Sequence, residues 1–178
     1  MSASDLDLVR LAQDGDRAAF RLLLERHYGL LYRVAYRFLG NRAEAEDAAQ
    51  EMAMTLAEKI GSFRGGSRFS TWIYQIVLNH CRDQVRRQKS LGRMQTAFVE
   101  VEAHRTADWV DSDRRVRWLY RAIDRLKPDL KETALLVLAE EMSHAEAGDV
   151  LGIKEATVSW RMHEVRKQLS QMATTNDD

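Results

Sequence analysis

Apolar side chains recur at three- and four-residue intervals along almost the whole chain, and this spacing lapses in one long stretch, residues 91–113. The clearest run lies in residues 41–60 and consists of Ala45, Ala48, Ala49, Met52, Leu56 and Ile60. Such spacing lines one side of an amphipathic helix. The 178 residues include one proline and nine glycines, which are too few breaks for a turn-rich β fold. The sequence therefore predicts an all-α protein.

Capping signals set the bounds of the predicted helices. Three residue pairs have the spacing of a capping pair: Ser4 with Asp7, Asn41 with Glu44, and Ser143 with Glu146. We expect two helices before Gly40, and then helices over residues 41–60, 69–88, 114–125, 128–141, 144–151 and 155–172. Paired glycines make residues 62–67 a predicted loop.

The long gap in the helical pattern divides the chain into two parts. Residues 1–90 carry 14 Lys and Arg against 11 Asp and Glu, residues 91–113 carry two against five, and residues 114–178 carry 11 of each. An aperiodic connection of about twenty residues is unusual inside one compact domain. We therefore expect two small helical domains, residues 1–90 and 114–172, joined by a flexible linker over residues 91–113 and followed by a disordered tail over residues 173–178.

Composition and missing motifs exclude several classes of protein. Cys81 is the only cysteine, so no intrachain disulfide can form and a cytoplasmic location fits best. No apolar run approaches the ~18 residues of a membrane span, and the first residues lack the pattern of a signal peptide. The sequence has no CxxC, GK[ST], GxSxG or HExxH motif. We expect no metal, no other cofactor, no membrane insertion and no enzymatic activity.

Residues 143–169 have the pattern of a helix-turn-helix. After a short capped helix and a turn at Gly152, a longer helix carries the apolar stripe Val158, Met162, Val165 and Leu169. Its other side carries Glu155, Ser159, Trp160, His163, Arg166 and Lys167. Such a helix can enter the major groove of DNA, with Arg161, Arg166 and Lys167 near phosphates. An ordinary helical hairpin with a solvated charged face is the alternative.

A second candidate site is formed by Asp47, Gln50 and Glu51. Offsets of three and four residues place them on one face of the predicted 41–60 helix, opposite the alanine stripe. Two carboxylates and an amide are typical of a docking surface for a basic partner, and they also occur in metal sites and acid–base pairs. Judged from this pattern alone, a plain solvated helix face is the favoured interpretation.

A third candidate site begins at Phe63 and continues to Lys89, with aromatic side chains interleaved with arginines beside the glycine-rich loop. Aromatic and cationic side chains together suit single-stranded DNA, because bases stack while guanidinium groups hold the backbone. Phe69 and Trp72 are expected to belong to the core instead. The remaining polar side chains are the candidates for DNA contact: Ser67, Arg68, Gln75, Asn79, Arg82 and Arg86.

Taken together, these segments resemble the extracytoplasmic-function (group 4) sigma factors of bacterial RNA polymerase, within the sigma-70 family. Residues 45–51 are similar to region 2.2 of the family, residues 62–83 to regions 2.3–2.4, and residues 126–131 and 151–161 to region 4. The resemblance implies a sigma region 2 helical bundle and a sigma region 4 helix-turn-helix. It also implies an alternative sigma factor that directs core polymerase to specific promoters.

The resemblance assigns roles to three sets of residues. Docking on the β′ clamp helices of core polymerase falls to Asp47, Gln50 and Glu51. Binding of the −10 element falls to Arg64, Ser67, Arg68, Gln75, Asn79, Arg82 and Arg86. Of these, Ser67, Arg68, Gln75 and Asn79 are expected around a flipped base. Contact with the −35 element falls to Thr157, Ser159, Trp160, Arg161, His163, Glu164, Arg166 and Lys167. The β flap of polymerase and an anti-sigma factor are further expected partners.

The chain departs from the family pattern in its helix-turn-helix. Ser159 and Glu164 stand where basic residues are usual and Trp160 where a small residue is usual, which predicts weaker phosphate attraction. Gly148 is expected to loosen the hairpin, since glycine inside a helix costs up to about 1 kcal/mol. Two rival functions remain open, a stand-alone helix-turn-helix regulator of transcription and a DNA-processing enzyme that uses the carboxylate face with a metal.

Overall fold

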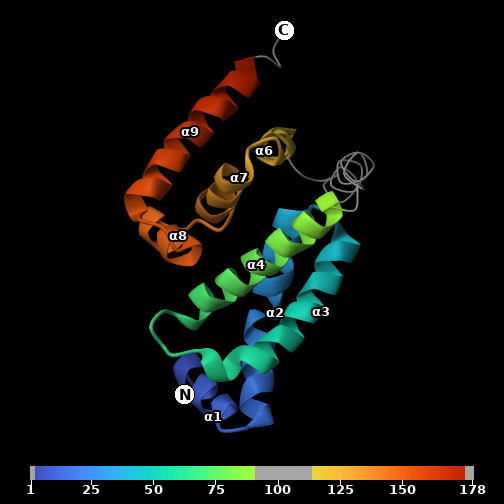
Figure 1. The fold of residues 1–178 in the computed structure, drawn as a ribbon, viewed down its shortest axis with the longest axis vertical. Coiled ribbons are helices and arrows are strands. Elements are labelled where there is room, and N and C mark those ends of the chain that lie inside the picture. The colour runs from blue at the N-terminus through green and yellow to red at the C-terminus, as the bar shows by residue number, and fades with distance from the viewer. Residues whose placement is uncertain (1–2, 91–113, 175–178) are drawn as a thin grey trace. The chain divides into compact units, whose positions relative to one another are not determined.

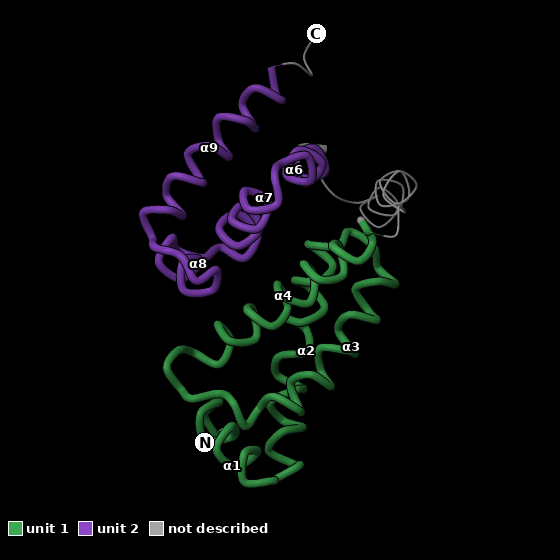
Figure 2. Tube along the Cα trace, in the orientation of Figure 1, with its two compact units in different colours: residues 1–101 green, residues 102–178 purple. Residues whose placement is uncertain are grey.

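The computed structural model describes residues 3–90 and 114–174, and every regular element in these segments is a helix (Figure 1). The predicted all-α class is therefore confirmed. The chain divides into two compact units, residues 1–101 and 102–178, and each is considered by itself (Figure 2). The expected linker over residues 91–113, and residues 175–178 of the expected tail, lie outside the described residues.

The first unit contains α1 (Asp5–Gln13), α2 (Arg17–Leu39), α3 (Arg42–Lys59), the short 3-10 turn η1 (Ile60–Ser62) and α4 (Phe69–Ser90). Two of these helices begin at the predicted caps, Ser4 and Asn41. Ser4 forms a reciprocal capping box with Asp7, and the side chains of Asp16 and Asn41 cap α2 and α3. Gly40 ends α2 in the left-handed conformation, at a φ of 75°, which glycine adopts without strain.

Helix α2 is the centre of the first unit and packs against α1, α3 and α4. The space between these helices is filled by large side chains that are at most 1% exposed: Leu23, Leu31, Met52, Ile73, Val77 and Leu78. Burying one such side chain contributes about 1.5–3 kcal/mol. Ala45, Ala48 and Ala49 are fully buried, and their small size lets α3 lie close to its neighbours. The alanine stripe therefore fixes which side of α3 turns away from the core.

The second unit also follows the predicted order of helices. It contains α6 (Arg114–Asp124), α7 (Pro128–Ala134), the π-helical turn η2 (Leu135–Ala139), α8 (His144–Leu151) and α9 (Glu155–Thr174). Helix α9 runs through the first two residues of the expected tail. No helix in residues 3–90 or 114–174 has the length and apolar composition needed to cross a membrane.

The predicted helix over residues 128–141 is not one uniform α-helix. After Ala134 the hydrogen bonds widen, and the amide of Glu140 donates to the carbonyl of Leu135 at 3.0 Å. Glu141 then turns the chain with a positive φ of 55°. A π turn contains about one residue more than an α turn, and a single such turn is too short for the apolar spacing to reveal it.

The helix-turn-helix is formed by α8, the turn at Gly152 and α9. Val158, Met162 and Val165 are fully buried as predicted, while Leu169 is only half-buried. The expectation that Gly148 loosens this hairpin is wrong in its physical basis. A Cβ atom on Gly148 would lie 2.8 Å from the carbonyl oxygen of Ile153, so the turn approaches α8 more closely than any larger residue allows. The amide of Ile153 also donates to the carbonyl of Gly148 at 3.0 Å.

Candidate protein and nucleic-acid interfaces

The acidic face of α3 consists of Asp47, Gln50 and Glu51, and all three side chains are exposed. It lies opposite the buried alanine stripe, as the residue offsets predict. Across from it, Nε2 of His80 on α4 lies 3.5 Å from Oε2 of Glu51, whose side chain is still 61% exposed. His80 therefore contacts the acidic face at Glu51, while the side chains of the face remain exposed to solvent.

Met54 extends the acidic face by one helical turn and is not among the residues predicted from the sequence. It follows Glu51 by three residues and Asp47 by seven, which places all of them on one side of α3. Its side chain is 62% exposed, an unusual state for methionine. The signal that identifies it is the helical offset from Asp47, since methionine by itself is usually a core residue.

The glycine loop, residues 63–68, connects η1 to α4. Gly65 has a φ of 72°, and Cβ atoms built on Gly65 or Gly66 would meet nothing within 4 Å. The side chains of Arg64, Ser67 and Arg68 are exposed. The loop thus presents two guanidinium groups and a hydroxyl on a backbone with little steric restriction.

An aromatic cluster closes the base of the glycine loop. Phe63 and Phe69, one at each end, are both buried, and their rings meet edge to face with centroids 5.4 Å apart. Trp72 is half-buried and packs on both rings, at 5.4 Å from Phe63 and 5.6 Å from Phe69. The expectation that Phe69 belongs to the core is confirmed, and Trp72 forms the outer edge of the same cluster.

Helix α4 carries the other residues that the sequence assigns to the −10 element. Steps of four, three and four residues place Gln75, Asn79, Arg82 and Arg86 along one side of the helix. Asn79 and Arg86 are exposed, while Gln75 and Arg82 are half-buried. A guanidinium nitrogen of Arg82 donates to Oδ1 of Asn79 at 3.1 Å, which leaves the Asn79 amide group to act as a donor.

Two residues outside these predicted sets contact the ends of the glycine loop. Nε2 of Gln13 lies 2.9 Å from the carbonyl oxygen of Ile60 and 2.8 Å from that of Phe63. The ring of His27 meets the ring of Phe69 edge-on, with centroids 5.4 Å apart. No motif identifies them, because both contacts join helices that are far apart in the sequence.

The exposed side of α9 has the composition predicted for the helix-turn-helix. Trp160 is 62% exposed, and Ser159, His163, Arg166 and Lys167 are exposed as well. Thr157 is half-buried near the start of the helix. Glu164 is half-buried, accepts a hydrogen bond from Gln168 at 2.8 Å and lies 3.9 Å from Nζ of Lys167.

Arg161 differs from the other arginine assigned to this surface because it turns towards α7. Its guanidinium lies 3.8 Å from the carboxylate of Asp129, and Nη1 donates at 3.4 Å to Oγ1 of Thr133. The side chain is only 18% exposed. Arg161 thus joins α9 to α7, whereas Arg166 extends into solvent.

Each of the two units matches the model of a known protein family. The family model for Sigma-70 region 2 matches residues 23–91, and the model for Sigma-70 region 4 matches residues 116–169. The chain is 32% identical to the ECF RNA polymerase sigma factor SigM of Mycobacterium tuberculosis, over 95% of this chain and 84% of SigM. It is 28% identical to SigW of Bacillus subtilis, over 90% of this chain and 92% of SigW.

Solved structures show the same fold. CnrH, in complex with the cytosolic domain of CnrY, has a TM-score of 0.69 and 25% identity, over 96% of this chain and 97% of CnrH. RpoE of Bartonella quintana, in complex with the anti-sigma factor NepR, has a TM-score of 0.66 and 21% identity, over 87% of this chain and 96% of RpoE.

Proposed function

The chain belongs to the ECF group of the sigma-70 family of RNA polymerase sigma factors, and on this premise we propose that it binds core RNA polymerase and directs it to specific promoters. The resemblance that the sequence predicts is confirmed by these matches. A stand-alone regulator is not favoured, because a helix-turn-helix alone gives region 2 no role. Like the family as a whole, the chain acts as an initiation factor, and we propose that it has no catalytic activity of its own.

We assign binding of core polymerase to the acidic face of α3. Its carboxylates are exposed and can pair with basic side chains such as those expected on the β′ clamp helices. Met54 adds an exposed apolar side chain beside them, and burial of such a group supplies affinity that exposed ion pairs alone do not.

We assign recognition of the −10 element to the glycine loop and to the polar side of α4. Arg64 and Arg68 can hold the strand, while Ser67 and Asn79 can donate hydrogen bonds to an unstacked base. One captured base is worth roughly 1–3 kcal/mol. This is close to the mean of about 1.4 kcal/mol for one stacked base-pair step, so capture opens the duplex only together with polymerase.

We assign the −35 element to α9. The exposed Trp160, His163, Arg166 and Lys167 can reach a major groove, with Trp160 suited to apolar contact with a thymine methyl group. Arg161 contributes by fixing α9 on α7, and this revises the phosphate role expected from the sequence. The contact with the β flap of polymerase is assigned to this second unit from the family resemblance.

We further propose an anti-sigma factor as a regulatory partner. RpoE of Bartonella quintana, which has the same fold, was solved in complex with the anti-sigma factor NepR. A site of action in the cytoplasm follows from the proposed partnership with core polymerase.

The observation that carries this proposal is the order of the two matches. Region 2 falls on the unit with the acidic face and the glycine loop, and region 4 falls on the unit with the helix-turn-helix. Run-off transcription with purified core polymerase and a library of genomic promoter fragments tests it. We expect transcripts from a small set of promoters only when the chain is present. Identical transcription without the chain would overturn the proposal.

A further inference from the structure

We propose that helix α1 holds the glycine loop in the shape that captures a base, with Gln13 and His27 as positioning residues. The inference rests on the −10 role proposed above. It concerns residues that neither the sequence motifs nor the −10 assignment include, and α1 itself lies before the segment matched by the region 2 model, residues 23–91.

The first anchor is at the start of the loop. Gln13 is the last residue of α1 and is exposed, and its side-chain amide donates to the carbonyls of Ile60 and Phe63 at 2.9 and 2.8 Å. The Ile60 carbonyl also accepts from the amide of Phe63 at 3.2 Å within η1, whereas the Phe63 carbonyl lies beyond the end of η1. The two N–H groups of one glutamine amide can satisfy both carbonyls at once. Gln13 therefore fixes the direction in which the chain leaves η1 and enters the loop.

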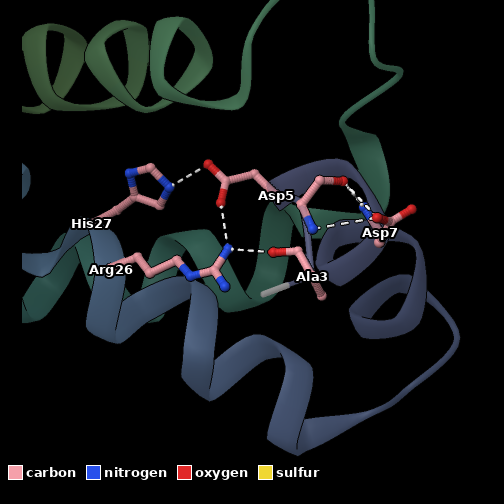
Figure 3. A network of polar contacts seen from close by, with 6 residues as sticks. Ala3, Asp5, Asp7, Arg26 and His27 are labelled. Carbon is pink, nitrogen blue, oxygen red and sulfur yellow. Dashed lines mark hydrogen bonds and ion pairs between the residues drawn. The ribbon is translucent and has the colours of Figure 1, made fainter. Parts of the chain in front are cut away.

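The second anchor is at the end of the loop. Phe69, the first residue of α4, is 5% exposed and packs edge-on against the His27 ring. Nε2 of His27 in turn lies 2.8 Å from a carboxylate oxygen of Asp5, the first residue of α1 (Figure 3). The other carboxylate oxygen accepts a hydrogen bond from Arg26 at 3.0 Å. Asp5 thus fixes the orientation of the ring that supports Phe69.

Between these anchors, two glycines leave part of the loop backbone with few steric limits. Gly65 and Gly66 meet no neighbours at their Cβ positions, and glycine has the largest choice of backbone conformations. A loop that becomes ordered only on binding gives a lower affinity, because the ordering costs conformational entropy. Because the first and last residues of α1 act at the two ends of the loop, α1 limits the positions that Arg64, Ser67 and Arg68 can take.

The test compares Gln13→Met with Asp16→Ala in holoenzyme reconstituted with core polymerase. Gln13→Met keeps the length of the side chain and removes both donors. Asp16→Ala is the control, because it removes the cap of α2 and so lowers stability, while the Asp16 side chain bonds to Ala18 and Ala19 and not to the loop. Three affinities are measured for each protein. They are the affinity for core polymerase, for the −10 strand of a promoter found by the run-off experiment, and for the same strand with an abasic site at each position in turn.

We expect Gln13→Met to bind core polymerase normally and to bind the intact strand about tenfold more weakly, the ratio that one or two lost hydrogen bonds produce. We also expect the abasic site that most weakens the wild type to have little effect on Gln13→Met, because its loop no longer holds that base. Asp5→Asn, at the other end of α1, should show the same pattern. Asp16→Ala should keep the wild-type sensitivity to the abasic site.

Two outcomes overturn the inference by itself. One is that Gln13→Met and Asp5→Asn both bind the intact strand as tightly as the wild type and lose as much affinity as the wild type when the strand carries the abasic site. The other is that Gln13→Met loses affinity for both core polymerase and the strand, and that Asp16→Ala loses as much. Such a shared loss would reflect reduced stability only. A wild-type chain that fails to bind core polymerase overturns the proposed function, and this inference with it.

Discussion

The hydroxyl of Ser159 on α9 lies 2.8 Å from Nδ1 of His144, the first residue of α8, so a hydrogen bond joins the two helices of the helix-turn-helix. In the family pattern a basic residue is expected at this position of the recognition helix. In this chain the serine instead serves the geometry of the motif itself. The contact lies at the exposed end of the interface between α8 and α9, so its contribution is limited by competition with water.

Replacing Ser159 with alanine should loosen α8 against α9. We expect a loss of about 0.5–1.5 kcal/mol in local stability, the usual net value of one hydrogen bond. Hydrogen–deuterium exchange of the amides in α8 and α9 measures it. Ser170→Ala is the matched control, because Ser170 is an exposed serine on the same helix. Equal exchange in the two variants would show that the contact with His144 contributes nothing.

Gly148→Ala should destabilise the second unit, although alanine is the better helix former. The added Cβ would meet the backbone oxygen of Ile153 at 2.8 Å, and backbone cannot move aside as a flexible side chain can. We expect a net loss of about 1–3 kcal/mol, as for other overpacked sites. Gly29→Ala, in the middle of α2, meets nothing within 4 Å and should instead gain up to about 1 kcal/mol. Urea unfolding of both variants checks the opposite signs, and a stable Gly148→Ala protein would contradict the tight turn.

The outcome for Gly148 illustrates what the sequence could predict. Caps at Ser4, Asn41 and Ser143 were found because capping depends on residues only three positions apart. The acidic face of α3 followed from helical offsets for the same reason. The approach of Ile153 to Gly148 depends on tertiary geometry, so only the average cost of glycine in a helix could be predicted.

The same limit applies to residues that bridge distant helices. Gln13 reaches Ile60 and Phe63, and Arg161 reaches α7, across separations that no local pattern encodes. Arginine on a predicted recognition helix suggests phosphate contact, and only the packed structure shows that one arginine turns inward and another outward. The class of fold and the helical faces that carry the candidate residues were therefore predictable, while the supporting contacts were not.

Reversing the charge of the acidic face should abolish binding to core polymerase. In Asp47→Lys/Glu51→Lys two carboxylates become ammonium groups on exposed positions, so repulsion replaces attraction while the helix is kept. Glu25→Lys is the control, because Glu25 is an exposed glutamate on α2 away from this face. Pull-down with core polymerase measures binding, and circular dichroism measures helix content. Binding by the doubly reversed protein would remove the docking role from this face.

Asp5 should stabilise the first unit in a pH-dependent way. Partial burial acts to raise the pKa of its carboxyl, but hydrogen bonds and charge from His27 and Arg26 outweigh this and hold the pKa below its usual 3.8. A lowered pKa in the folded state gives stability that is present above pH 3.8 and is lost as the pH falls through the folded value. Urea unfolding should therefore show wild type more stable than Asp5→Asn at pH 7, with the difference shrinking below pH 3.8. A difference that is the same at both pH values would contradict the ion pairs as its cause.

Replacing Arg166 should change the salt dependence of duplex binding, whereas replacing Arg161 should change the stability of the second unit. Arg166 is exposed, and if it neutralises a phosphate, Arg166→Ala should reduce the slope of log affinity against log salt by about 0.9. Arg161→Ala should leave that slope unchanged, because its guanidinium is held by Asp129 and Thr133. It should instead destabilise the second unit, since it leaves Thr133 and Asp129 without this partner. Binding of holoenzyme to −35 duplex DNA at several salt concentrations gives the slopes, and urea unfolding gives the stabilities. A slope reduced by Arg161→Ala as much as by Arg166→Ala would return Arg161 to the DNA surface and remove its role as a tie between α9 and α7.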